Sequence, residues 1–226
     1  MEENLIREQI MEDMVDFLKR QTIQLSNESK DGRVNSFSDE KVIINFLLKY
    51  AKESLFLKNT GLKIKIPQER NWYDFAFLKS DNSLFIPIDI KVSKLKNADN
   101  TNSKLSIFYV ISGVDPDEIT DISKWDIFFK SLTNYRGTNK NKDFYFLVVN
   151  KNNPKDIFFT SLKTIKELTP NANNLPFQCK WNKNRERILR THEEAEGFIL
   201  TALYKSIKMD QKREYADMYL PKILNK

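Results

Sequence analysis

The sequence contains little glycine, cysteine or histidine, and each shortage excludes a class of site. Only 5 Gly occur among 226 residues and no G-x-x-x-x-G-K motif is present, so a glycine-rich phosphate loop is not expected. The single cysteine, Cys179, cannot form an internal disulfide or build a zinc cluster. The single histidine, His192, stands at the start of a predicted helix, which favours a surface residue over a catalytic one.

Long apolar segments are also missing. No stretch of 18 apolar residues occurs, so no transmembrane helix and no membrane partner are expected. The first 20 residues begin with Glu2 and Glu3 and contain no long apolar run, so we expect no signal peptide. Together with the lone cysteine, these absences favour a cytoplasmic protein. The length and the lack of an obvious linker predict a single domain over residues 1–226.

Positive charge exceeds negative charge, with 37 Lys and Arg against 31 Asp and Glu, a net charge of +6. The distribution is uneven. Five basic residues lie between Lys180 and Arg190 beside one acid, Glu186, whereas the first 16 residues hold six acids and one base, Arg7. This pattern favours a protein with a nucleic-acid-binding face and a separate packing face. The alternative is two ordinary solvated surfaces.

Hydrophobic spacing predicts a mixture of helices and strands. A helix is expected over residues 2–25, and a second one from an N-cap at Ser38 and Asp39 to about residue 57. The last predicted helical region, 191–225, begins with a capping box formed by Thr191 and Glu194. Strands are predicted over 62–66, 73–78, 84–92, 105–112, 144–149 and 157–159, and further helices over 115–132 and 161–168. This order predicts an α/β (α+β) fold with a central mixed β-sheet flanked by helices.

The most informative stretch is a predicted hairpin over residues 72–92. A tight turn centred on Asp81 and Asn82 gives cross-strand partners whose numbers sum to 163. Asp74 then lies opposite Asp89, and Lys91 points to the same face as Asp89 because it is two residues further along the strand. Two carboxylates and an amine therefore gather at one end of a hairpin whose other face is apolar.

This trio has the composition of a metal-dependent hydrolytic site. Adjacent carboxylates repel each other, and a divalent cation such as Mg²⁺ relieves the repulsion while accepting their oxygens as ligands. Asp74 and Asp89 are the predicted metal ligands, and Lys91 would orient or deprotonate the attacking water, or neutralise charge on the phosphate. The alternative is a half-exposed hairpin with an incidental Asp89–Lys91 ion pair.

The same residues resemble the PD-(D/E)xK motif of nucleases. Tyr73-Asp74 stands where the family has Pro-Asp, and Asp89-Ile90-Lys91 stands where it has (D/E)-x-K. The order and spacing of further segments resemble the EcoRV branch of type II restriction endonucleases, so that the similarity covers residues 31–92. These segments are Asp31-Gly32-Arg33-Val34, Ser38-Asp39-Glu40-Lys41-Val42 and residues 67–71.

The resemblance implies a restriction-endonuclease-like core and a homodimer that makes a double-strand, blunt cut at a palindrome in double-stranded DNA. It implies Mg²⁺ as cofactor, with Mn²⁺ as a possible substitute and Ca²⁺ supporting binding without cleavage. A cognate methyltransferase is expected in the cell, but not as a subunit. The additional acid that the family often carries on the preceding helix falls on Leu48, which cannot ligate metal, so Glu40 and Glu53 are the candidates to replace it.

Three stretches are candidates for contacting DNA, and the segment 169–190 is the main candidate for sequence recognition. Amide side chains pair with adenine in the major groove, whereas basic residues and hydroxyls contact phosphates, so an amide-rich segment favours an A·T-rich target. The alternative is a solvated loop. The predicted DNA-binding residues are Gln68, Arg70 and Asn71, then Lys94, then Asn171, Asn173, Asn174, Gln178, Asn182 and Arg185. The resemblance adds Ser93, which is similar in place to a hydroxyl residue that contacts backbone phosphate in the family.

Two other functions share this core. A structure-specific repair or resolvase nuclease would use the same trio, but the long polar segment 169–190 favours an enzyme that reads sequence. A non-catalytic DNA-binding protein with the same fold is the third hypothesis, and the intact Asp74, Asp89 and Lys91 argue against it.

Overall fold

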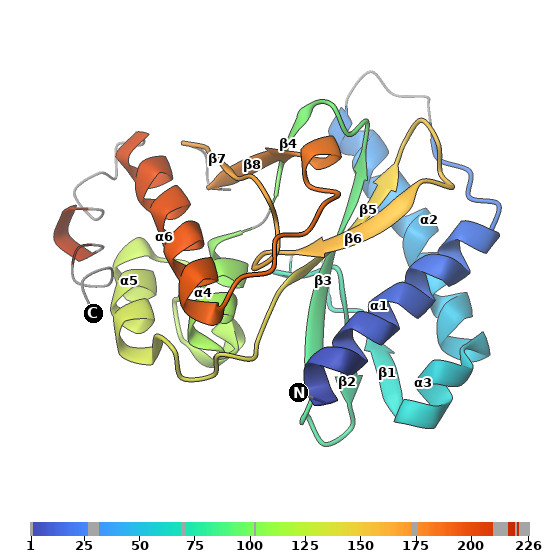
Figure 1. Ribbon diagram of the computed structural model, residues 1–226, viewed down its shortest axis with the longest axis horizontal. Coiled ribbons are helices and arrows are strands. Elements are labelled where there is room, and N and C mark those ends of the chain that lie inside the picture. The colour runs from blue at the N-terminus through green and yellow to red at the C-terminus, as the bar shows by residue number, and fades with distance from the viewer. Residues whose placement is uncertain are drawn as a thin grey trace. The chain divides into compact units, whose positions relative to one another are not determined.

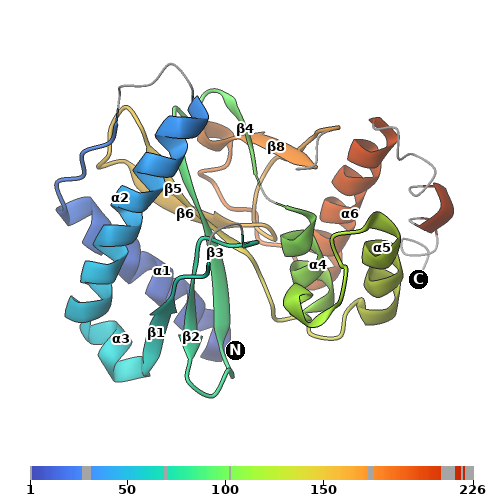
Figure 2. The same cartoon turned by 180° about the vertical axis from the view of Figure 1, so that it is seen from behind.

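The computed structural model describes residues 2–26, 32–68, 71–101, 103–172, 176–209, 217–219 and 221, with the side chains of residues 2 and 32–37 left out. The chain divides into two compact units (Figures 1 and 2). The first comprises residues 1–97 and 145–160, and the second comprises residues 98–144 and 161–226. The single domain expected over residues 1–226 stays a prediction.

The first unit is built on a mixed sheet of five strands, which confirms the mixed sheet flanked by helices that the sequence predicts. The strand order is β1-β2-β3-β5-β6, with β1, β2 and β3 antiparallel and β3 parallel to β5. The strands are β1 (Leu62–Lys65), β2 (Phe75–Lys79), β3 (Phe85–Ser93), β5 (Tyr145–Asn150) and β6 (Ile157–Ser161). The helices of this unit are α1 (Glu2–Arg20), α2 (Gly32–Glu53) and α3 (Leu55–Thr60).

The two long helices of this unit contribute to one hydrophobic core with the sheet. Ile10 of α1 and Leu47 of α2 are fully buried there, together with the even-numbered residues Ile86, Ile88 and Ile90 of β3. Each such side chain stabilises the fold by about 1.5–3 kcal/mol. Because side chains alternate along a strand, the odd-numbered residues 89 and 91 of β3 point to the opposite face.

The β2–β3 hairpin has the predicted register. Phe75 pairs with Ile88, and Phe77 pairs with Ile86, so partner numbers sum to 163 as expected. The turn is centred where predicted, since Asn82 has a positive φ of 57° and Asp81 accepts hydrogen bonds from the backbone N–H and hydroxyl of Ser83. Asn is one of the few residues that adopt this conformation readily.

Helix α2 begins earlier than predicted. The N-cap expected at Ser38 and Asp39 is wrong, because the helix already starts at Gly32 and Asp39 lies inside it. Asp39 is fully buried, and its carboxylate accepts hydrogen bonds from the backbone N–H and hydroxyl of Ser26 and pairs with Lys151. These partners are distant in sequence, so local capping rules misassign the residue.

In the second unit, the secondary structure predicted for one segment is wrong. Residues 105–112, predicted as a strand, form helix α4 (Lys104–Ser112). The residues from Ser106 to Ser112 are all buried, and a short run that is apolar on every side has no periodicity that separates a strand from a buried helix. The helix ends at Gly113, whose φ is 77° and where a Cβ would lie 2.4 Å from the Asn139 carbonyl oxygen.

The remainder of this unit combines short helices with a small antiparallel sheet of order β4-β8-β7. The predicted helix over 115–132 is a 3-10 turn, η1 (Pro116–Glu118), followed by α5 (Trp125–Tyr135). The helix predicted over 161–168 is wrong, because Ser161 ends β6 and a turn, a bend and irregular backbone follow it. The segment 169–190 contains β7 (Thr169–Pro170), β8 (Phe177–Lys180) and η2 (Trp181–Lys183), and β4 (Ala98–Asn100) pairs with β8.

Helix α6 (His192–Met209) begins with the predicted capping box. Thr191 Oγ1 accepts from the Glu194 backbone N–H at 3.2 Å, and the Glu194 carboxylate accepts from the Thr191 N–H at 2.8 Å. No helix within the described ranges is both long and apolar enough to cross a membrane.

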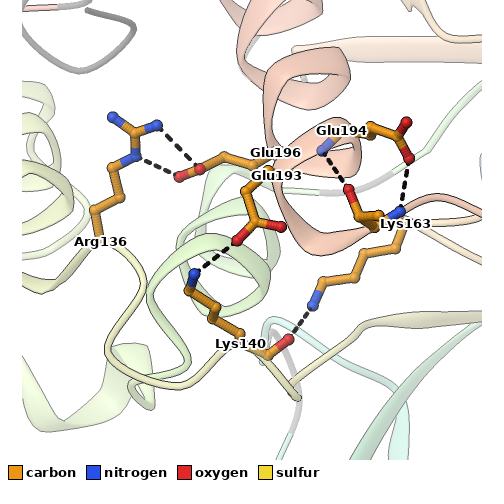
Figure 3. Close-up of polar contacts among 7 residues, drawn as sticks. Arg136, Lys140, Lys163, Glu193, Glu194 and Glu196 are labelled. Carbon is orange, nitrogen blue, oxygen red and sulfur yellow. Dashed lines mark hydrogen bonds and ion pairs between the residues drawn. The ribbon is translucent and has the colours of Figure 1, made fainter. Parts of the chain in front are cut away.

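Ion pairs hold the first turns of α6 to the segment that follows α5 (Figure 3). The Arg136 guanidinium donates two hydrogen bonds to the buried Glu196 carboxylate, at 2.6 and 3.0 Å. Lys140 pairs with Glu193 at 2.6 Å, and Lys163 donates to the Lys140 carbonyl at 2.7 Å. The bidentate Arg136 pair fixes geometry as well as charge, so it is the strongest anchor of the group.

Candidate active site

Asp74 and Asp89 lie opposite each other where β2 begins. The Asp74 backbone N–H donates to the Ile88 carbonyl at 2.9 Å, and the Ile90 N–H donates to Asp74 Oδ2 at 2.6 Å. Asp74 is therefore hydrogen-bonded to Ile88 and Ile90, the two residues that flank Asp89. The predicted facing of the two carboxylates follows from this arrangement.

Lys91 lies on the same sheet face as Asp89. Its Nζ is 2.9 Å from Asp89 Oδ2, and the two side chains are 21% and 16% exposed. In the parallel register with β5, Asp89 is paired with Phe146 and Lys91 with Val148, both fully buried. The trio is thus a polar cluster on an apolar strand, partly open to solvent.

Burial and mutual repulsion set the charge of Asp89. Removal from water raises the pKa of its carboxyl well above the ordinary value, and Asp74 raises it further by its charge and by a hydrogen bond. Lys91 opposes both effects without cancelling them. A divalent cation would remove the cause of the shift, because it replaces lost hydration and neutralises the carboxylate pair.

Lys91 is held in its charged form. Burial lowers the pKa of the ammonium, but Asp89, Asp74 and Glu40 outweigh that effect and raise it above the ordinary value. A lysine with a raised pKa is a poor proton acceptor near neutral pH. Lys91 is therefore better suited to stabilising negative charge on a phosphate than to removing a proton from water.

Asp74 and Asp89 suit Mg²⁺ as a pair. This ion binds proteins through one or two carboxylates and completes its octahedron with waters and substrate phosphates, so two carboxylates suffice. Among the described residues, no group of three or more His, Cys, Asp or Glu side chains is arranged to hold a metal. A third protein ligand is consequently not required by the chemistry and is not assembled in the described part of the chain.

Of the two candidates for an additional acid, Glu40 is the better placed. Its charge contributes to the raised pKa of Lys91, after the larger effects of Asp89 and Asp74. Glu53 lies at the end of α2, where its exposed carboxylate is 4.0 Å from the Lys49 ammonium. Leu48, where the sequence resemblance would place an additional acid, is 43% exposed.

A buried ion pair that sequence reasoning missed braces the end of β3. Lys151 Nζ lies 2.8 Å from Asp39 Oδ2, and the Lys151 backbone N–H donates to the Ser93 carbonyl at 2.8 Å. The pair links α2, the residue after β5 and the strand that carries the trio. No local motif identifies it, because its members are 112 positions apart in the sequence.

The predicted DNA-binding residues of the first unit differ in accessibility. Gln68 and Lys94 are exposed, and Asn71 is exposed while its side chain accepts from the Trp72 N–H. Ser93 is 4% exposed, and its hydroxyl accepts from the Leu95 N–H, so the structure gives this hydroxyl a local partner. Arg70 lies outside the described residues.

The second unit brings together two of the predicted residues and leaves others apart. Asn171 and Gln178 both donate to the side chain of Asn100. Asn182 and Arg185 are exposed along η2 and just after it. Asn173 and Asn174 lie outside the described residues.

Not every amide of this segment is available for recognition. Asn184 is fully buried, accepts from the Glu167 N–H, and donates to the carbonyls of Glu167 and Lys180. Its amide thus holds the segment together. This distinction is invisible in a sequence where asparagine is abundant.

Comparison with models of protein families gives no match for this chain. No curated protein matches it either.

Proposed function

We propose that this protein is a Mg²⁺-dependent DNA endonuclease of the type II restriction class, with a PD-(D/E)xK core and with Asp74, Asp89 and Lys91 as its catalytic residues. One observation carries the proposal. Two carboxylates and a protonated lysine share one end of a hairpin, although burial makes that charge cluster costly to the fold. Titratable side chains whose pKa is shifted by burial together with a charged neighbour are typical of functional sites.

Each residue of the trio has a defined task. Asp74 and Asp89 would hold the cation, which supplies Lewis acidity and charge neutralisation at the scissile phosphate. The Ile90 N–H orients the Asp74 carboxylate through its 2.6 Å hydrogen bond. Lys91 places a positive charge where negative charge develops on the phosphate during attack by water.

Double-stranded DNA is the proposed substrate, cut on both strands at a palindrome by a homodimer. The basic segment 180–190 supports a polyanionic partner, since phosphate contacts by Lys and Arg supply most of the affinity of DNA-binding proteins. A repair or resolvase nuclease is the second candidate, because it would use the same trio on branched DNA.

A digest of long double-stranded DNA tests the proposal. Wild-type protein with Mg²⁺ is expected to give discrete fragments, and EDTA is expected to prevent them because both carboxylates then lack their cation. Sequencing of the fragment ends gives the site and shows whether the ends are blunt. Nicking confined to branched DNA would favour the second candidate, and intact DNA from many sources under varied salt would contradict any nuclease.

Replacing Lys91 tests its role in charge stabilisation. Lys91→Met keeps the chain length but removes the positive charge, so we expect cleavage to slow by about 100- to 1,000-fold. Binding of the same DNA in Ca²⁺ should change far less, because phosphate contacts elsewhere supply the affinity. Single-turnover cleavage and a gel-shift titration measure the two effects.

Lys63→Met is the matched control for this substitution. Lys63 is an exposed lysine on β1 of the same sheet, and its loss should leave cleavage within about twofold. If Lys91→Met cleaves DNA at the wild-type rate, Lys91 has no part in the mechanism.

A further inference from the structure

The small sheet of the second unit has a buried face and a more open face. Phe177 and Cys179 of β8 are 0% and 2% exposed, whereas Gln178 is partly exposed and Lys180 is exposed. Ser206 of α6 donates to the Pro176 carbonyl just before β8, so this helix anchors the sheet. The alternation leaves the side chains of residues 178 and 180 on the face that is more accessible to solvent.

Three amide side chains meet at Asn100. Asn100 Oδ1 accepts one hydrogen bond from Asn171 Nδ2 and one from Gln178 Nε2, each at 3.1 Å. Asn100 ends β4 and is the cross-strand partner of Gln178, and Asn171 directly follows β7. Residues 71 and 78 positions apart in the sequence thus form one surface cluster, which we call the amide triad.

The shared acceptor gives the triad a fixed polarity. An isolated surface amide can exchange its oxygen and nitrogen ends by rotation, but a donor held by Asn100 keeps its nitrogen on that side. Gln178 retains a second N–H and its Oε1 beyond the bond to Asn100. Such a pair, one donor beside one acceptor, complements N7 and the N6 amino group of adenine in the major groove.

The surroundings of the triad favour a polyanion. Lys180 lies two residues from Gln178 on the same strand, and Lys183 and Arg185 follow it, all exposed. The only acid between residues 180 and 190, Glu186, is paired with Lys166 at 2.5 Å. A β-ribbon is one of the elements that fit the major groove, so a sheet face that combines amides with basic residues suits duplex DNA.

We propose that Asn100, Asn171 and Gln178 form a base-reading site for adenine in the major groove, with Lys180 on the adjacent phosphate. This inference rests on the proposed function for its ligand, double-stranded DNA, and assigns the triad a part in sequence recognition. Asn100 is a positioning residue, because it acts by orienting the other two amides. Gln178 makes the base contact, and Asn171 donates to the same acceptor, Asn100 Oδ1.

Selection from a random duplex library tests the inference without requiring cleavage. Full-length protein in Ca²⁺ is used to enrich bound duplexes, which are then sequenced. Wild type should enrich adenine at defined positions, and Gln178→Ala should lose that preference by about 10- to 100-fold at one position per half-site while keeping the others. Asn100→Ala should weaken the same position, since it releases the orientation of Gln178.

Modified DNA identifies the atom that is read. Replacing the selected adenine by 7-deazaadenine removes the N7 acceptor, so wild type should lose about tenfold or more in affinity whereas Gln178→Ala should be insensitive. Asn59→Ala, which removes an exposed amide from α3, is the matched control and should enrich the wild-type sequence.

The outcomes separate this inference from the proposed function. If Gln178→Ala and Asn100→Ala enrich the wild-type sequence unchanged, the triad does not read bases, although DNA cleavage still stands. If wild type enriches no sequence, base reading fails, and the digest with Mg²⁺ decides independently whether the protein is a nuclease.

Discussion

Asp89→Asn is expected to reduce DNA cleavage by about 1,000-fold, the largest effect on activity that we expect from a single substitution. The neutral amide keeps the size of the side chain but removes one of the two negative charges that would hold Mg²⁺. Single-turnover cleavage of a duplex that carries the mapped site measures the loss. Folding is checked in parallel by thermal unfolding, so that loss of the cation can be separated from loss of the structure.

The same substitution should stabilise the metal-free protein. Because burial raises the pKa of Asp89, the folded protein holds this proton more tightly than the unfolded chain does, and ionisation at neutral pH destabilises the fold. We expect Asp89→Asn to raise Tm in EDTA by about 2–4 °C for each kcal/mol of the cost of burying the charged carboxylate that the substitution removes. The gain in Tm should shrink as pH is lowered from neutral toward the ordinary range of a carboxyl group. There Asp89 of the wild type is protonated in the unfolded chain as well as in the folded protein, so its ionisation no longer favours unfolding.

Asp117→Asn is the control for both measurements. Asp117 is exposed in η1, so its replacement should change neither cleavage nor Tm appreciably. A lower Tm for Asp89→Asn at neutral pH would show that the 2.9 Å pair with Lys91 outweighs the cost of burying Asp89. Unchanged cleavage would exclude Asp89 as a metal ligand.

Lys151→Ala is expected to have the largest effect on stability, about 3–5 kcal/mol. Its ammonium is the cation that neutralises Asp39, which is fully buried, and removing it leaves an uncompensated carboxylate inside the first unit. Urea unfolding with a constant slope gives the free-energy change. The large loss of stability comes from leaving the Asp39 carboxylate buried without its partner. An intact buried ion pair contributes little net stability, because its attraction is offset by the cost of removing both charges from water.

Two further variants distinguish the ion pair from a general packing role. Lys155→Ala removes a nearby exposed lysine that donates to the carbonyls of Lys19 and Gln21, and it should cost about 1 kcal/mol or less. The double variant Asp39→Leu, Lys151→Met replaces both charges with apolar groups and should recover much of the lost stability. A double variant no more stable than Lys151→Ala would contradict this electrostatic account.

The local parts of the site were predictable because their determinants are close in sequence. Asp81 and Asn82 fix the turn, and the two-residue alternation of the flanking strands then places Asp74 opposite Asp89 with Lys91 beside them. The capping box of Thr191 and Glu194 was predictable for the same reason, since both hydrogen bonds span three residues. In each case short-range stereochemistry leaves few alternatives.

The sequence by itself determined the β2–β3 hairpin that carries Asp74, Asp89 and Lys91, the mixed sheet and the start of α6, and tertiary structure decided what depends on distant partners. The stretch 105–112 folds as a helix although its apolar run is equally compatible with a strand, because burial on all sides hides the period. Asp39 is an ion-pair partner of Lys151 instead of an N-cap, and Asn100 joins Asn171 and Gln178, because strand pairing brings together residues that no local pattern relates. Periodicity and turn chemistry depend on residues a few positions apart. The roles of buried charges and side-chain clusters depend instead on the residues that the fold brings next to them.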